Sequence, residues 1–251
     1  MILDVALRDE VAVAANVLAR LGLVTAYGHV SARAGESMLI TPAADLAGVT
    51  SSAVVEVPLA ATARPAATLP AGAPAEAWAH LALYRARPDA AAIARAQPPG
   101  AFAVAAAVTT MVPLHGQAAW LGESVPVYHD ATLLRSPDQA ERAARCLPAG
   151  EALLLRGNGA ITLGATPGLA VTRMWLLAAA CDVYLAAMSA AGAASGANPV
   201  TPLSASEIAS WRAVSGELLP RLWQHLRSRP GSSGSSGSAG SAGPGPGEEQ
   251  G

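Results

Sequence analysis

Lysine is absent from the sequence. All 16 basic residues are arginines, in a chain of 251 residues. A Schiff-base aldolase and a pyridoxal-phosphate enzyme each need a lysine amine as the nucleophile. The composition therefore excludes both of these enzyme classes.

Charge is scarce as well. Only 14% of the residues are charged, the formal net charge is −2, and no basic stripe is visible along the chain. Proteins that bind nucleic acid carry a basic patch or stripe that neutralises phosphates. We therefore expect no nucleic acid as a partner.

Features of secreted and membrane proteins are also missing. The two cysteines, Cys146 and Cys181, are isolated in apolar helical patterns, so we expect buried thiols and no disulfide or metal pair. The longest apolar run, residues 171–191, is interrupted by Arg173 and Asp182, which is unfavourable in a membrane span. The N-terminal segment is acidic where a signal peptide needs basic residues. We expect a cytoplasmic protein with no membrane partner.

Hydrophobic periodicity predicts helices and strands that alternate along the chain. The predicted helices are 9–23, 75–86, 101–109, 136–146, 167–188 and 204–227. The predicted strands are 29–33, 37–41, 54–57, 90–95, 124–128, 151–156 and 160–163. Short antiparallel strand pairs favour an α/β fold with a central, mostly antiparallel sheet covered by helices.

The composition changes sharply near residue 230. Residues 230–251 consist almost entirely of glycine, serine and proline, with too few apolar side chains to form a core. We therefore expect one folded domain over residues 1–229 and a disordered tail over 230–251.

Three parts of the chain, residues 26–33 with 39–43, 76–89 and 153–164, carry motifs that resemble those of the class II aldolase/adducin family. The segment 26–33 (AYGHVSAR), with 39–43 (LITPA), is similar to the family's two N-terminal strands. The segment 76–89 (EAWAHLALYRARPD) resembles its catalytic-glutamate helix, and 153–164 (LLLRGNGAITLG) resembles its Arg-Asn-His-Gly strand. The segments follow in the family's order. The resemblance implies a three-layer α-β-α domain, carbon–carbon lyase activity and a homotetramer.

The resemblance also implies a zinc site made of three histidines, of which two are spaced His-x-His and one lies in the Asn-His-Gly turn. The corresponding positions here are Arg95, Gln97 and Asn158. An arginine stays protonated and has no lone pair for a cation, and side-chain amide oxygens are weak ligands. We therefore expect no metal ion and no other cofactor.

The family's phosphate-binding positions have lost their hydroxyl groups. Relatives that act on sugar phosphates bind the phosphate through small and hydroxyl residues at positions that are filled here by Ala43, Ala44, Pro74 and Ala75. The resemblance therefore implies a non-phosphorylated substrate.

The polar residues that remain still suggest a site. Glu76 keeps the family's spacing to Arg95 and Gln97, and the resemblance implies that these residues share a pocket with Asn158 and His29. Glu76 is the candidate catalytic acid/base. Arg95 is the candidate catalytic cation, which could pair with a substrate carboxylate. The candidate substrate-binding residues are His29, Gln97 and Asn158.

Three functions stay open at this point. The first is a metal-independent lyase that acts on a small carboxylated substrate by decarboxylation, retro-aldol cleavage or enolate isomerisation. The second is a non-catalytic binding or assembly module, like adducin head domains, in which Glu76 and Arg95 are only a structural ion pair. The third is a metalloenzyme with other ligands, drawn from Glu76, His29, His80, His115 or Asn158. Asn158, between two glycines, is also typical of a left-handed turn residue.

Overall fold

The computed structural model describes residues 2–60, 68–193 and 200–229. The predicted disordered tail, 230–251, lies outside the described residues. Its disorder therefore stays a prediction.

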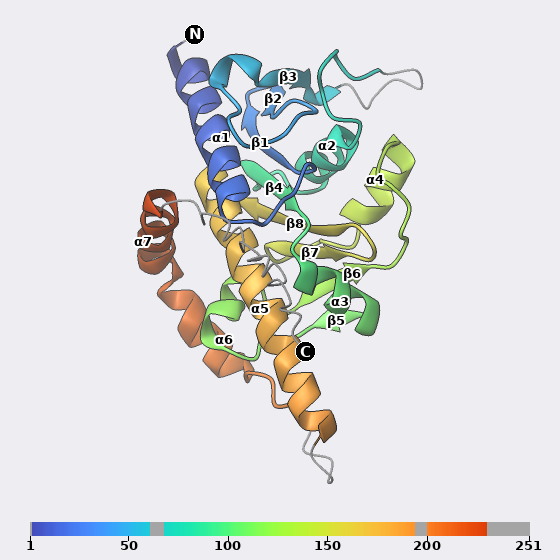
Figure 1. Cartoon of the computed structure of the whole chain (residues 1–251), viewed down its shortest axis with the longest axis vertical. Helices are drawn as coiled ribbons and strands as arrows, with labels where there is room; N and C mark the ends of the chain where they lie inside the picture. The colour runs from blue at the N-terminus through green and yellow to red at the C-terminus, as the bar shows by residue number, and fades with distance from the viewer. Residues whose placement is uncertain (1, 61–67, 194–199, 230–251) are drawn as a thin grey trace, which may run out of the picture.

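A mixed, mostly antiparallel sheet forms the centre of the molecule, as predicted (Figure 1). Its strands are β1 (His29–Ala34), β2 (Ser37–Ile40), β3 (Val55–Pro58), β4 (Ala92–Ala96), β5 (Thr110–Met111), β6 (Val125–Tyr128), β7 (Ala152–Leu155) and β8 (Gly159–Gly164). The eight strands run in the order β3-β2-β1-β4-β8-β7-β6-β5. The pairs along this order are antiparallel except β6 with β7, which is parallel. The expected α/β fold is confirmed.

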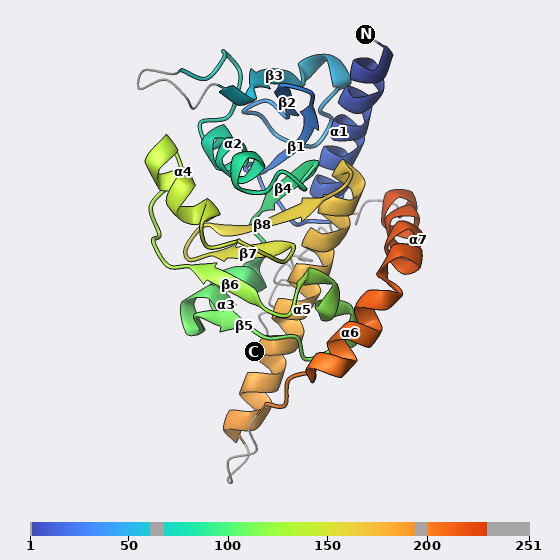
Figure 2. The ribbon, with the colours of Figure 1, turned by 180° about the vertical axis from the view of Figure 1, so that it is seen from behind.

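Helices cover both faces of this sheet (Figures 1 and 2). The helices are α1 (Ile2–Arg20), α2 (Ala77–Ala86), α3 (Pro99–Ala107), α4 (Pro137–Ala144), α5 (Pro167–Ala193), α6 (Ala205–Ala213) and α7 (Ser215–Ser228). Side chains of α1, α3 and α5 share one apolar core with the sheet, and side chains of α2 and α4 share a second core on the opposite face. Helix α7 packs outside α5 and α1.

Strand alternation separates the two cores. In β4, Ala92, Ala94 and Ala96 belong to the core beneath α5, whereas Ile93 belongs to the core beneath α2. Successive strand residues point to opposite faces of a sheet. Arg95 therefore points to the same face as Ile93, toward α2.

Two predicted helix boundaries were wrong. Helix α1 begins at Ile2 rather than residue 9, because Arg8 anchors the first turns through Asp4 and the backbone carbonyl of Val54. The predicted helix 204–227 is two helices, α6 and α7, which meet at Val214. At this junction the Ser215 hydroxyl donates a hydrogen bond to the backbone carbonyl of Arg212. This bond competes with the backbone hydrogen bond that the same carbonyl would accept in a continuous helix.

The two-residue strand β5 was not predicted, because two residues are too few to show a period.

Helix α5 is the one helix in the described ranges that has the length and hydropathy of a membrane span, over Pro167–Gly192. It packs lengthwise against β4, β8, α1 and α3. Leu176, Leu177 and Cys181 on this helix are fully buried. In this structure the apolar composition of α5 serves the core beneath the sheet.

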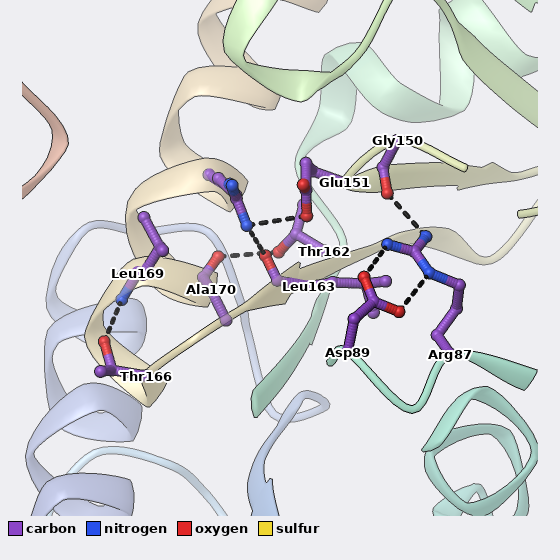
Figure 3. A network of polar contacts seen from close by, with 10 residues as sticks. Arg87, Asp89, Gly150, Glu151, Thr162, Leu163, Thr166, Leu169 and Ala170 are labelled. Atoms are coloured by element: carbon purple, nitrogen blue, oxygen red, sulfur yellow. Dashed lines mark hydrogen bonds and ion pairs between the residues drawn. The ribbon is translucent and has the colours of Figure 1, made fainter. Parts of the chain in front are cut away.

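The Arg-Pro-Asp motif ties the end of α2 to the loop before β7 (Figure 3). Arg87 donates from Nε and Nη2 to both carboxylate oxygens of Asp89, at 2.9 and 2.6 Å, and from Nη1 to the backbone carbonyl of Gly150, at 2.8 Å. Nearby, Arg173 of α5 donates to Glu151 and to the backbone carbonyl of Leu163, both at 2.8 Å. These bonds hold β4, β7 and β8 in a fixed relation.

We predict that Arg87→Ala lowers the free energy of unfolding by about 1–3 kcal/mol, because the Gly150 carbonyl loses its buried donor. Arg85→Ala is the matched control, since within the described residues Arg85 pairs with Glu141 alone and its side chain is 46% exposed. The control should change stability by less than about 1 kcal/mol. Urea unfolding of both variants measures the difference, and equal losses would contradict the role assigned to Arg87.

Candidate functional site

The pairing of β1 with β4 brings two of the predicted residues together. His29 lies directly opposite Arg95 in this antiparallel pair. Val30 of β1 and Ala94 of β4 belong to the core beneath α5. Alternation therefore turns His29, Ser31 and Arg95 toward α2.

Arg95 is almost completely buried and is surrounded by acceptors. Its residue is 3% exposed, and its Nη2 lies 3.4 Å from Oε2 of Glu76. The same nitrogen donates to the backbone carbonyl of Asn158, at 3.3 Å, and to the side-chain oxygen of that residue. Asn158 Nδ2 in turn donates to Glu76 Oε1, at 3.2 Å. Glu76, Arg95 and Asn158 thus form a closed triangle of polar contacts.

Gln97 completes this cluster. Both polar atoms of its amide find hydrogen-bond partners when the oxygen faces Arg95. In this orientation the oxygen accepts from Nη1, at 2.5 Å, and from Nη2, at 3.1 Å, and the nitrogen donates to the backbone carbonyl of Tyr27, at 2.5 Å. The structure therefore brings Glu76, Arg95, Gln97 and Asn158 together, as the sequence predicted. Whether they take part in a reaction stays a prediction.

The turn between β7 and β8 places Asn158 in reach of Arg95. Gly157 and Gly159 have φ angles of +69° and +85°. A β-carbon at Gly159 would lie 2.2 Å from the backbone oxygen of Ala96, so this turn packs directly on the end of β4. The interpretation of Asn158 as a left-handed residue was wrong, because the glycines on either side take the positive φ angles.

The electrostatics of the cluster centre on one buried charge. Burial lowers the pKa of Arg95, and the neighbouring Glu76 carboxylate opposes that effect. An arginine nonetheless stays protonated in proteins. Glu76 occupies the N-cap position of α2, where the partial positive charge of the helix end also favours a carboxylate. The charges of Glu76 and Arg95 therefore compensate each other.

A cavity of about 360 Å³ opens beside this cluster. Its lining residues are Ala26, Tyr27, Gly28, His29, Pro42, Ala43, Ala44, Asp45, Pro74, Ala75, Glu76 and Arg135. Among the described residues Arg95, Gln97 and Asn158 do not belong to this lining, so Glu76 stands between Arg95 and the cavity. Glu76 is thus the member of the charged pair that a ligand in the cavity can touch.

The sequence analysis missed three lining residues, Tyr27, Asp45 and Arg135. All three are exposed and lie in loops, where no periodic pattern marks them. Arg135 reaches the cavity from the loop before α4, far along the chain from Glu76. Only the position of Tyr27, inside the segment 26–33 that resembles the family, offered a signal.

A second cluster of polar side chains, made of Ser31, His80 and Tyr84, is buried next to His29. His80 of α2 is fully buried, and its Nδ1 lies 2.7 Å from the hydroxyl of Ser31. That hydroxyl lies 2.8 Å from the hydroxyl of Tyr84. Burial and then the charge of Arg95 lower the pKa of His80 to about 3. Burial, His80 and Arg95 also lower the pKa of His29 well below its ordinary value.

The residues at the family's metal positions do not fit a divalent cation. A guanidinium fills the first position, and both amide oxygens at the other two positions accept hydrogen bonds from it. Over residues 2–60, 68–193 and 200–229, no three His, Cys, Asp or Glu side chains gather as a metal site. His115, one of the alternative ligands, precedes a 3-10 helix that packs against α5 and α6.

Residues 9–185 match the family described as the class II aldolase and adducin N-terminal domain. The chain belongs to this family. The sequence resemblance is therefore confirmed, and the matched region contains every residue of the cluster around Arg95.

Solved structures of this family share the fold. The chain is 28% identical to L-fuculose-1-phosphate aldolase from Thermus thermophilus, with a TM-score of 0.66 over 75% of this chain and 98% of that one. It is 21% identical to YgbL from Escherichia coli, for which an aldolase/epimerase/decarboxylase activity has been suggested, with a TM-score of 0.68 over 84% and 99% of the two chains. The class II aldolase-like fold is thus established.

Curated relatives match over a shorter stretch. Human beta-adducin is 31% identical over 114 residues, which is 45% of this chain and 16% of that protein. A 4-hydroxy-3-prenylphenylpyruvate oxygenase/4-hydroxy-3-prenylbenzoate synthase from Streptomyces roseochromogenus subsp. oscitans is 33% identical over 115 residues, or 45% and 42% of the two chains. The chain therefore spans less than half the length of either relative.

We predict that Glu76 and Arg95 are energetically coupled by about 1–3 kcal/mol. Both side chains are largely buried, at 13% and 4% exposure, so removing either one leaves the other without its partner. A double-mutant cycle with Glu76→Leu and Arg95→Leu, followed by urea unfolding, measures the coupling. The exposed pair Arg85 and Glu141 is the control and should couple by less than about 1 kcal/mol. Additive losses at Glu76 and Arg95 would show that their contact carries no energy.

Proposed function

We propose that this chain is a metal-independent lyase of the class II aldolase type that acts on a small carboxylated, non-phosphorylated substrate. The observation that carries the proposal is the position of Glu76, which lines the cavity while Arg95 holds it from behind. A carboxylate that is fixed by a buried cation and open to a ligand on its other side is suited to proton transfer.

The proposed chemistry passes through an enolate. Glu76 takes a proton from a substrate hydroxyl, whose oxygen becomes a carbonyl as the adjacent carbon–carbon bond breaks. The electron pair of that bond moves into the neighbouring carbonyl group and gives the enolate. Glu76 then returns the proton to the resulting enolate carbon. Isomerisation uses the same enolate and the same proton donor. In a decarboxylation the enolate forms by loss of CO2 from the substrate carboxylate, and its carbon then takes a proton that Glu76 has first accepted from water. When Glu76 becomes neutral, the uncompensated charge of Arg95 stabilises the negative charge that develops in the cavity.

The lining of the cavity supports a carboxylated substrate without a phosphate. Ala43, Ala44, Pro74 and Ala75, at the positions where relatives bind phosphate, do line the cavity and carry no hydroxyl group. Arg135 supplies an exposed guanidinium at the same cavity, and a guanidinium pairs with a carboxylate through two parallel hydrogen bonds. The Streptomyces relative is named for a phenylpyruvate and a benzoate, both of which are carboxylates.

A binding or assembly module is the alternative, and the similarity to beta-adducin favours it. In that case the Glu76–Arg95 pair only stabilises the fold. For either function we propose a homotetramer, because exposed apolar side chains such as Phe102, Val183 and Met188 offer surface for subunit contacts. Light scattering at micromolar concentration tests this, and a monomer mass would contradict it.

We predict that the protein exchanges the C3 protons of small 2-oxo acids, such as pyruvate and 2-oxobutyrate, with deuterium from D2O. Glu76→Gln should slow the exchange by about 10²–10⁴-fold, the usual contribution of a positioned acid/base. Proton NMR follows the exchange, and EDTA should leave the rate unchanged. Asp45→Asn is the matched control, since Asp45 lines the same cavity without contacting Arg95.

Two results would contradict the proposal. Exchange that is lost to EDTA, with a metal-to-subunit ratio near one by elemental analysis, would favour a metalloenzyme. Binding of 2-oxo acids by calorimetry, without any exchange in the wild type, would favour the binding module.

A further inference from the structure

Two buried imidazoles beneath the cavity each have a nitrogen without a hydrogen-bond partner. In the described structure these atoms are Nδ1 of His29 and Nε2 of His80. The two rings meet edge to face, with 5.7 Å between their centroids. Buried polar atoms are almost always paired in proteins, so two such atoms on touching rings require an explanation.

The protonation of His80 is fixed by the hydroxyl groups behind it. Burial raises the pKa of Tyr84, so its hydroxyl keeps its proton. Ser31 is the hydrogen-bond partner of that hydroxyl within the described residues, so Tyr84 donates to Ser31. The Ser31 hydroxyl in turn donates a hydrogen bond to Nδ1 of His80, at 2.7 Å. His80 is neutral, so it carries its hydrogen on Nε2.

The hydrogen on His80 Nε2 determines the tautomer of His29. A buried N–H needs an acceptor, and the unpartnered Nδ1 of the neighbouring His29 ring is one. A buried Nε2–H beside an unpartnered ring nitrogen favours the tautomer in which that nitrogen, Nδ1 of His29, is the acceptor. His29 then carries its hydrogen on Nε2. Since His29 lines the cavity, this N–H can point at a ligand.

We propose that His29 is a further catalytic residue, which donates a hydrogen bond from Nε2 to the substrate carbonyl oxygen as the enolate forms. The inference rests on the proposed function, because it requires a carbonyl compound beside Glu76. A neutral imidazole serves here as the electrophile, in the role that the family resemblance implies for a metal ion. Donors of this kind contribute about 10²–10³-fold to kcat.

The surroundings keep His29 neutral. The charged and titratable groups around it include Arg95 on β4, His80 on α2 and Glu76 at the start of α2, and the cavity that it lines also contains Asp45 and Arg135. Burial disfavours an imidazolium most, His80 and Arg95 add to this effect, and the Glu76 charge is already paired with Arg95. A neutral ring can donate to a developing oxyanion without losing a proton of its own.

Nitrogen-15 NMR of histidine-labelled protein tests the tautomers directly, because the shifts of Nδ1 and Nε2 identify the protonated nitrogen. We expect His29 and His80 to be neutral Nε2–H tautomers at pH 7, with the exposed His225 as an internal reference. Oxalate, a mimic of a carboxylated enolate, should shift the Nε2 signal of His29. A charged His29, an Nδ1–H tautomer, or no shift at saturating oxalate would overturn the proposal.

Substitutions separate a donor role from a structural one. His29→Gln keeps an amide nitrogen near the position of Nε2, whereas His29→Asn places its amide near Nδ1. In pyruvate exchange, His29→Leu should lower kcat by about 10²–10³-fold with little change in KM, and His29→Gln should recover at least about tenfold of this loss. Equal rates for the Gln and Asn variants would contradict a donor at Nε2. If Glu76→Gln exchanges normally, the proposed function fails while the NMR result still decides the tautomer.

Discussion

A guanidinium that is buried inside a sheet constrains everything around it. An unpaired charge in such a place would cost several kcal/mol, so the structure must supply acceptors from every side. Arg95 receives them from the start of α2, from the end of its own strand and from the β7–β8 turn, through Glu76, Gln97 and Asn158. Three separate segments are thereby drawn to one point. Glu76 faces Arg95 on one side and lines the cavity on the other.

This arrangement changes the chemistry that the family scaffold can offer. A metal ion is a positive charge that binds substrate oxygen directly, whereas Arg95 lies behind Glu76 and out of direct reach of the cavity. The positive charge therefore acts through Glu76 and through space. In the proposed function, direct contact with a substrate oxygen comes from the neutral imidazole of His29 or from Arg135 at the cavity lining. A single metal ion would both supply the positive charge and bind the substrate oxygen, whereas this site assigns these two roles to different residues.

The sequence predicted the sheet and the cluster but not the cavity. Period-two patterns located most strands, and the family resemblance placed Glu76, Arg95 and Asn158 in one pocket, where they lie in contact. Arg135 could not be predicted, because its approach to Glu76 depends on how α4 and its loop pack over α2. The tautomer that we propose for His29 could not be predicted either, since it depends on the hydrogen bonds among Tyr84, Ser31 and His80. The split at Val214 depended on one serine hydroxyl.

The backbone of the β7–β8 turn keeps its path whatever side chain residue 158 carries. Gly159 is held against β4 by contacts that leave no room for a β-carbon, so the path of the turn is set without any help from residue 158. The side chain of residue 158 points toward Arg95 and takes no part in fixing the backbone of the turn. A change of identity at that position can therefore alter what the site binds while the turn keeps its shape. The backbone of the turn thus tolerates a change at 158 but not at 159, and a change at 158 must leave Arg95 with another acceptor.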